Sequence, residues 1–138
     1  MSRPTLDAVL MQIAHAWATR GTCARRKVGA VLADSRGVVV SHGYNGALSG
    51  QPHHTDARVD EPCDRCEHAE RNALYHAARR GVSTLGTVAY LTDAPCLACA
   101  RGLVQAGVAR VIYDRPYRIT AGLDLLGDVG IPVERWDN

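Results

Sequence analysis

The stretch TVAYLTDAPCLACARGLVQAGVARVIYD, residues 87–114, decides the fold of this chain. It contains a β-rich run, a helical segment that ends at a glycine, and a second β-rich run. These three parts cover residues 87–92, 96–106 and 109–114. Two strands that are joined through a helix normally lie parallel in one sheet, because the crossover packs the helix back onto that sheet. The stretch therefore predicts an α/β protein.

The remaining segments extend this unit in both directions along the chain. Upstream, apolar residues at helical spacing are followed by two β-rich runs with a short turn, which is typical of an antiparallel hairpin. A long connection without periodicity, residues 45–66, then leads to another helix. The further predicted elements are helices 5–20, 68–80 and 121–128 and strands 28–34, 37–44 and 131–136. This order predicts a three-layer α/β/α sandwich on a mixed five-stranded sheet, with strands three to five parallel.

Length and composition fit a globular enzyme or binding domain. A chain of 138 residues suits one domain, residues 1–138, with a single core. No apolar run approaches the roughly 20 residues that cross a membrane, and the N-terminal segment is typical of an amphipathic helix rather than a signal peptide. We therefore expect a cytoplasmic protein without a membrane partner. The net charge of +2 is too small to indicate a nucleic-acid partner.

The chain has five cysteines, arranged as two Cys-x-x-Cys pairs and a single residue. They are Cys23, Cys63, Cys66, Cys96 and Cys99. A disulfide framework would favour an even number and a secretion signal, and neither is present. Metal ligation is the better interpretation of the two pairs.

Three of the candidate ligands lie at predicted helix starts. His68 opens the helical run EHAERNALYHAARRG, residues 67–81, and Cys96 and Cys99 share the first turn of a later helix. Helix N-termini carry partial positive charge, which favours the thiolate form that binds metal. One histidine and two cysteines leave the fourth tetrahedral position open, which is typical of a catalytic zinc.

Glu70 has a different predicted task. It lies two residues from His68, so it projects from another side of the turn and can approach a zinc-bound water without binding the metal. Zinc lowers the pKa of bound water from about 16 towards 7, and Glu70 can pass the released proton to N3 of a cytosine and then to the departing ammonia. The alternative is the polar start of an ordinary amphipathic helix. His-x-Glu together with Pro-Cys-x-x-Cys is the signature of zinc nucleobase deaminases, which favours the catalytic interpretation.

The chain also resembles a known family. Over nearly its whole length it is similar to the cytidine deaminase-like superfamily, and most of all to the deoxycytidylate (dCMP) deaminases. The resemblance rests on RRKVGAVLAD, SHGYNGALSG, CDRCEHAERNAL, AYLTDAPCLACARGLVQAGVARVIYD and Tyr117. It implies hydrolysis of dCMP to dUMP and ammonia by a zinc-bound hydroxide, with Glu70 as the proton shuttle. It also implies a homo-oligomer, a dimer or a hexamer, and control by dCTP and dTTP as in many members.

The resemblance further implies substrate-binding positions. Asn45 would contact the deoxyribose, and backbone groups around Ala69 would read the base edge. Without the family, Asn45-Gly46 reads as a plain turn. A bound phosphate needs positively charged side chains to balance its charge. The candidates form two groups: Arg26 and Lys27 before the first strand, then Arg115 and Arg118 on either side of Tyr117.

A second zinc is a further expectation from the family, because several members carry a structural ion in this region. Cys23, His53 or His54, Cys63 and Cys66 could form a closed four-ligand site that pins the long connection. Relatives place a cysteine where this chain has Thr55, so the ligand set stays open. The alternative is free thiols in a reducing cytoplasm.

Other functions remain open at this point. The substrate could be a modified dCMP, free cytosine or cytidine, or adenosine in tRNA. The tRNA-editing relatives usually have Glu-Pro-Cys where this chain has Ala94-Pro95-Cys96. A different class is a non-catalytic zinc-binding module. Glu70 distinguishes these classes, since a purely structural site needs no carboxylate beside an open coordination position.

Overall fold

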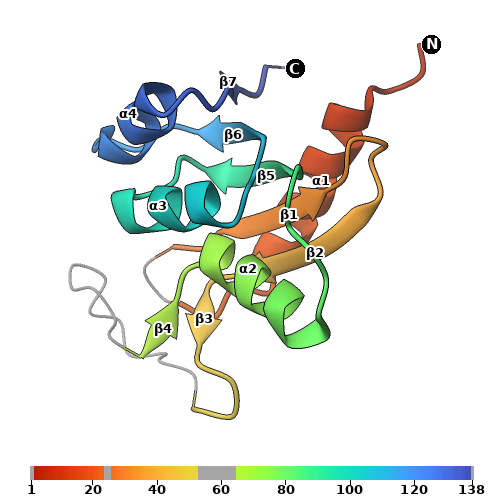
Figure 1. Ribbon diagram of the computed structural model, residues 1–138. Helices are drawn as coiled ribbons and strands as arrows, with labels where there is room; N and C mark the ends of the chain where they lie inside the picture. The colour runs from red at the N-terminus through yellow and green to blue at the C-terminus, as the bar shows by residue number, and fades with distance from the viewer. Residues whose placement is uncertain (1, 24–25, 53–64, 138) are drawn as a thin grey trace.

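The computed structural model describes residues 2–23, 26–52 and 65–137. Within these ranges it has four helices and a five-stranded sheet in the order β2-β1-β5-β6-β7 (Figure 1). The elements are α1 (Leu6–Ala18), β1 (Gly29–Ala33), β2 (Val39–Tyr44), β3 (Gly46–Ala47), β4 (Cys66–Glu67), α2 (Ala69–Arg80), β5 (Val88–Asp93), α3 (Leu97–Gln105), β6 (Arg110–Arg115), α4 (Ala121–Asp128) and β7 (Val133–Arg135). None of the helices in these ranges is long and apolar enough to cross a membrane.

The sheet is mixed, as the sequence predicts. Strand β1 pairs antiparallel with β2 and with β5, whereas β5, β6 and β7 are parallel. The parallel part follows from the crossovers through α3 and α4, and the antiparallel edge follows from the β1–β2 hairpin. The three-layer α/β/α sandwich is therefore confirmed. The predicted elements agree with the observed ones to within two residues at each end.

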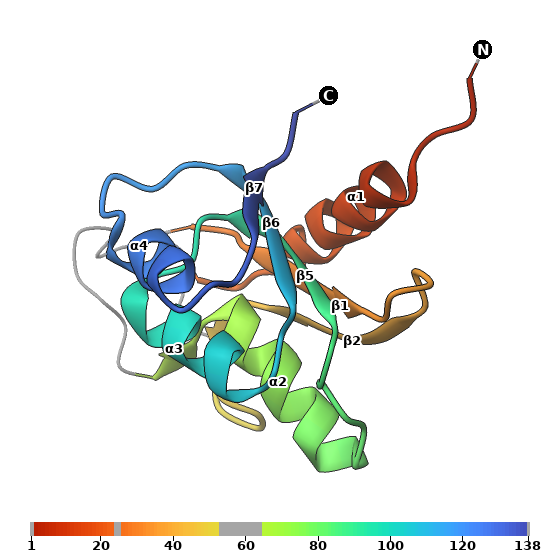
Figure 2. The same cartoon turned by 45° about the horizontal axis from the view of Figure 1, so that its top comes forward.

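Helices cover both faces of the sheet. Helix α1 lies on one face, and α2, α3 and α4 lie on the other (Figures 1 and 2). Every residue of β1 is buried because the strand is central and covered on both sides. The core under α1 includes Leu10, Met11, Ala14, Val31, Tyr90 and Ile112, and the larger core includes Leu32, Ala73, Leu91, Leu103, Val111 and Leu126.

The long connection before α2 is not entirely irregular. Its two ends form the short antiparallel pair β3–β4, in which Gly46 lies opposite Glu67 and Ala47 opposite Cys66. Strands of two residues show no periodicity, so the sequence did not predict them. The pair fixes the direction from which the chain enters α2, directly before His68. Residues 53–64 of this connection lie outside the described residues.

Strand β2 and helix α2 approach each other closely at Gly43. A Cβ atom at Gly43 would lie 2.4 Å from the Ala69 carbonyl oxygen and 2.6 Å from the Ala73 nitrogen. The Ser41 hydroxyl donates a hydrogen bond of 2.6 Å to the Ala73 carbonyl oxygen in the same contact. The missing side chain therefore lets the first turn of α2, which carries Glu70, lie directly on the sheet.

We predict that Gly43→Ala lowers the free energy of unfolding by about 1–3 kcal/mol, because the added methyl group overpacks this contact. Urea unfolding followed by circular dichroism measures the change. Gly127→Ala is the matched control, since a Cβ there meets nothing within 4 Å, and it should change stability by at most about 1 kcal/mol. Equal losses in the two variants would contradict the close-approach explanation.

Candidate active site

His68, Cys96 and Cys99 converge between two helix starts. His68 Nδ1 lies 3.5 Å from Cys96 Sγ and 3.3 Å from Cys99 Sγ. His68 is the N-cap of α2 and Cys96 is the N-cap of α3, and both have extended backbone angles. Helices α2 and α3 cover the same face of the sheet, and their N-caps meet beyond the carboxyl end of the central strand β5, which leads into α3.

These three residues fit a zinc ion. Tetrahedral zinc with a Zn–N distance of about 2.0 Å and a Zn–S distance of about 2.3 Å separates nitrogen from sulfur by about 3.5 Å. The observed distances match this value. Within residues 2–23, 26–52 and 65–137, His68, Cys96 and Cys99 are the group of metal-ligating side chains whose donor atoms lie close enough together to hold one ion. These atoms all lie within 4.8 Å of one another. Three protein ligands leave one position for water or substrate.

The two thiols differ in protonation. Hydrogen bonds from Cys99 and His68 lower the pKa of Cys96 to about 3, which favours its thiolate. The same hydrogen bond, together with burial, raises the pKa of Cys99. The backbone N–H of Cys99 also points to Cys96 Sγ at 3.5 Å, as expected of a helix N-terminus. A metal ion bound at this trio would favour the thiolate form of both cysteines.

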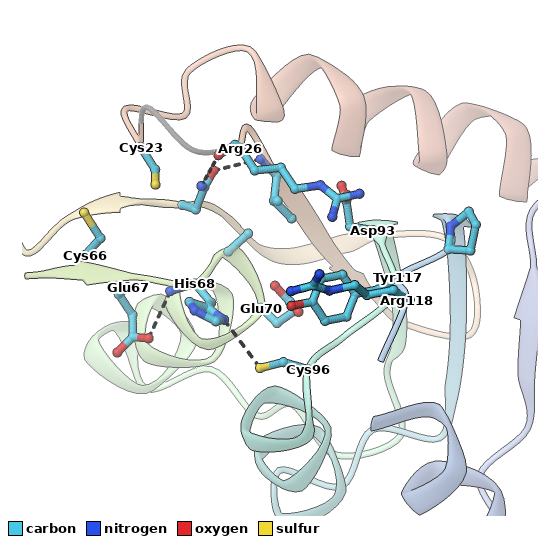
Figure 3. A pocket seen from close by; sticks show the side chains of 15 residues that line it. Cys23, Arg26, Cys66, Glu67, His68, Glu70, Asp93, Cys96, Tyr117 and Arg118 are labelled. Atoms are coloured by element: carbon cyan, nitrogen blue, oxygen red, sulfur yellow. Dashed lines mark hydrogen bonds and ion pairs between the residues drawn. The ribbon is translucent and has the colours of Figure 1, made fainter. Parts of the chain in front are cut away.

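Glu70 lies beside this trio without belonging to it. It is in the first turn of α2 and only 4% exposed. Burial in these surroundings raises the pKa of its carboxyl group to about 7. Figure 3 shows it with His68 and Cys96 among the side chains that line the cavity. A carboxyl group with a pKa near neutrality can both accept and release a proton, which is what general acid–base catalysis requires.

A cavity of about 630 Å³ opens beside the trio. This volume lies within the range of about 300–1,000 Å³ that is usual for small-molecule sites. The wall near the trio includes His68, Ala69, Glu70, Cys96, Asn45 and Val28. The remaining wall includes Arg26, Asp93, Pro116, Tyr117 and Arg118. The cavity therefore has one end where His68 and Cys96 lie beside the buried Glu70 and a separate region with guanidinium groups.

The predicted substrate residues divide into two groups. Asn45, Ala69, Arg26, Tyr117 and Arg118 line the cavity, as Figure 3 shows for the three that it labels. Lys27 and Arg115 are not among its lining residues. Lys27 is exposed, and Arg115 donates a hydrogen bond of 3.1 Å to its carbonyl oxygen. Of the four candidate cations, Arg26 and Arg118 therefore line the cavity, whereas Lys27 and Arg115 do not. The sequence alone could not make this distinction.

The Asn45 side chain forms hydrogen bonds with the backbone of the segment before β1. Its Oδ1 atom accepts a hydrogen bond of 2.7 Å from the Val28 N–H, and its Nδ2 donates to the Arg26 carbonyl oxygen. The carboxamide therefore holds the segment that leads into β1 at the cavity wall. The predicted contact with deoxyribose stays a prediction.

Half of the predicted second zinc site can be placed. Cys23 and Cys66 both line the cavity and lie at the same end of it (Figure 3). Of the other predicted ligands, His53, His54 and Cys63 lie outside the described residues.

Asp93 is a site residue that the sequence reasoning missed. It ends β5, lines the cavity and is 4% exposed. Its Oδ1 atom accepts hydrogen bonds from Thr92 Oγ1 at 2.7 Å and from Arg115 Nη2 at 2.8 Å. Its Oδ2 atom forms an ion pair with Arg26. An acidic residue at the carboxyl end of a buried strand was the available signal, because ligands bind at that end of parallel strands.

Comparison with known proteins gives consistent matches. Residues 4–115 match the cytidine and deoxycytidylate deaminase zinc-binding region. The chain is 34% identical over 140 residues to ComE operon protein 2 of Bacillus subtilis, covering 98% of this chain and 73% of that protein. It is 37% identical over 129 residues to the deoxycytidylate deaminase of Mycobacterium phage D29, covering 83% and 98%. The structure of dCMP deaminase from cyanophage S-TIM5 in complex with dCMP and dUMP superimposes with a TM-score of 0.90 at 33% identity, covering 99% of this chain and 100% of that chain.

Proposed function

The chain belongs to the family of the cytidine and deoxycytidylate deaminase zinc-binding region, and from this membership we propose that it converts dCMP and water to dUMP and ammonia. The observation that carries the proposal is the convergence of His68, Cys96 and Cys99 beside the buried Glu70 at the end of one cavity. The similarity to phage dCMP deaminases supports deoxycytidylate as the substrate.

In this proposal each residue has a defined task. His68, Cys96 and Cys99 hold zinc, which supplies the Lewis acidity that makes water a nucleophile at neutral pH. Glu70 accepts a proton from the attacking water and delivers it to N3 of the base. A bond forms from the water oxygen to C4, and the C4–amino bond then breaks. Glu70 transfers the second proton to the amino group, which leaves as ammonia.

The nucleotide would lie along the cavity with its base at the zinc end. Backbone groups around Ala69 would contact the base edge, and Asn45 would lie near the deoxyribose. Arg26 and Arg118 are the guanidinium groups that line the cavity, so we assign the 5′-phosphate to them. Tyr117 supports this region, since the Arg26 guanidinium carbon lies 5.9 Å from the centre of its ring.

A substrate panel tests the proposed function. Ammonia release is followed with dCMP, 5-modified dCMP, CMP, deoxycytidine, cytosine and a tRNA substrate. We expect the highest kcat/KM for dCMP. A higher value for another member of the panel would assign the enzyme to that substrate. Turnover of none of them by zinc-loaded protein would favour the alternative of a non-catalytic zinc-binding module.

Zinc stoichiometry tests the second predicted site. One zinc ion is expected at His68, Cys96 and Cys99, and a ratio of two per chain would support a second, structural ion that includes Cys23 and Cys66. Inductively coupled plasma mass spectrometry on the purified protein measures the ratio. A value of one would remove the structural ion. In that case Cys23→Ser should leave the zinc content unchanged.

Three further predictions accompany this function. Homo-oligomerisation as a dimer or hexamer is testable by light scattering, and control by dCTP and dTTP by adding them to the dCMP assay. A cytoplasmic location is testable by cell fractionation.

A further inference from the structure

Asp93 is a buried carboxylate that two arginines share at the cavity wall. Its side chain is 6% exposed, while those of Arg26 and Arg115 are 40% and 48% exposed. A carboxylate removed from water requires compensation by charge or hydrogen bonds. Here it receives more than one positive charge, and the three side chains together carry a net charge of +1. The excess cation is available to an anionic ligand.

The backbone and Thr92 hold Asp93 in place. Asp93 and Arg115 are register partners at the ends of the parallel strands β5 and β6, and the Ala94 N–H donates to the Arg115 carbonyl oxygen at 2.8 Å. The buried Thr92 hydroxyl accepts from the Gly29 N–H at 3.0 Å and donates to Asp93 Oδ1. The carboxylate is therefore oriented by groups that belong to the sheet.

Arg26 is the partner of Asp93 that reaches the cavity from outside the sheet. It comes from the segment before β1, outside the sheet, and lines the cavity. Figure 3 shows its side chain extending to Asp93. A guanidinium has five N–H donors, and the ion pair with Asp93 is made through Nη2. Other donors thus remain for a phosphate oxygen, while the long side chain is already restrained.

We propose that Asp93 is a positioning residue for nucleotide recognition: it holds Arg26 at the cavity wall, so that the guanidinium is ready to bind the 5′-phosphate of a nucleoside monophosphate. The proposal rests on the proposed function, because it deepens the assignment of the phosphate to Arg26. According to this proposal, Asp93 contributes to the preference for a nucleotide over a nucleoside, although it does not contact the phosphate itself. Pre-ordering a flexible side chain lowers the entropy lost when the ligand binds.

The competing role is purely structural. Asp93 and Arg115 also connect the ends of β5 and β6 to the segment before β1, because Arg115 Nη2 contacts both Asp93 and the Lys27 carbonyl oxygen. If that were the whole role, loss of the carboxylate would disturb the cavity for every substrate. Effects confined to substrates with a phosphate therefore separate positioning from general support.

Asp93→Asn tests the proposal. The amide nearly preserves the shape of the side chain but presents N–H donors to two guanidinium groups, so Arg26 should be released. We expect KM for dCMP to rise about tenfold with kcat changed less than twofold. Kinetics with deoxycytidine should not change. Asp114→Asn is the matched control, because Asp114 contacts His15 at 2.6 Å and does not line the cavity, and it should leave both substrates unaffected.

A double-mutant cycle shows whether Asp93 acts through Arg26. Arg26→Met alone should raise KM for dCMP at least as much as Asp93→Asn. The double variant should then equal Arg26→Met, because nothing remains for Asp93 to position. Additive effects, an unchanged or lower KM in Asp93→Asn, or an equal loss with deoxycytidine would each overturn the proposal.

Calorimetry extends the test beyond turnover. The product dUMP should bind about tenfold more weakly to Asp93→Asn than to the unaltered protein, whereas deoxyuridine binding should be the same. If Asp93→Asn does not fold, Asp93→Glu, which keeps the charge but displaces it, is expected to weaken dUMP binding severalfold without affecting deoxyuridine. Equal binding of dUMP would overturn the proposal. Failure of the unaltered enzyme to deaminate dCMP would instead refute the proposed function.

Discussion

Glu70→Gln is expected to lower kcat for dCMP by about 10²–10⁴-fold, the usual contribution of a positioned general acid–base group. The amide has nearly the same shape as the carboxyl group but cannot accept a proton from water or make the two proton transfers proposed for Glu70, one to N3 of the base and one to the departing amino group. Glu70 is buried at the end of the cavity where His68 and Cys96 lie. Ammonia release from saturating dCMP measures the loss.

The zinc content of this variant provides its internal check. Glu70 does not belong to the converging His68, Cys96 and Cys99 group, so Glu70→Gln should retain as much zinc as the unaltered enzyme. Glu134→Gln is the control, because Glu134 is paired with Arg110 and does not line the cavity. It should keep full activity. Deamination at an undiminished rate by Glu70→Gln would contradict the proton-transfer assignment.

Cys99→Ser is expected to lose the catalytic ion. A hydroxyl is a much poorer zinc ligand than a thiolate, and Cys99 is fully buried, so no other solvent-facing group replaces it easily. Zinc content should fall by about one ion per chain. We expect kcat/KM to fall by more than about 100-fold, the upper end of what loss of an outer-shell partner costs in metal sites.

Ala98→Ser is the matched control for this variant. Ala98 is an exposed residue in the same helical turn, so it receives the same hydroxyl without touching the trio. It should retain both zinc and activity. Full zinc content in Cys99→Ser would show that the ion is held by other residues. Metal analysis of both variants, purified side by side, decides the question.

The sequence by itself determined the architecture because the relevant signals are local. Residues 87–114 contain two apolar β-rich runs around a helix, and the connection through that helix requires parallel strands. The two ligand motifs are also local: His68 and Glu70 lie two residues apart, and Cys96 and Cys99 lie three apart at a helix start. Helix geometry therefore indicates how members of each motif lie relative to one another.

Only the tertiary structure decided which cations line the cavity and what holds them. Arg26 and Asp93 are far apart in the chain, and they meet because β1 lies beside β5 in the sheet. The pairing of Gly46 with Glu67 before α2 depends on a contact of the same kind. Such contacts arise from strand order and register, and they leave no periodic pattern in the sequence. The candidate zinc ligands and Glu70 could thus be identified from their spacing, whereas the part of the cavity to which we assign the phosphate could be identified only in the assembled sheet.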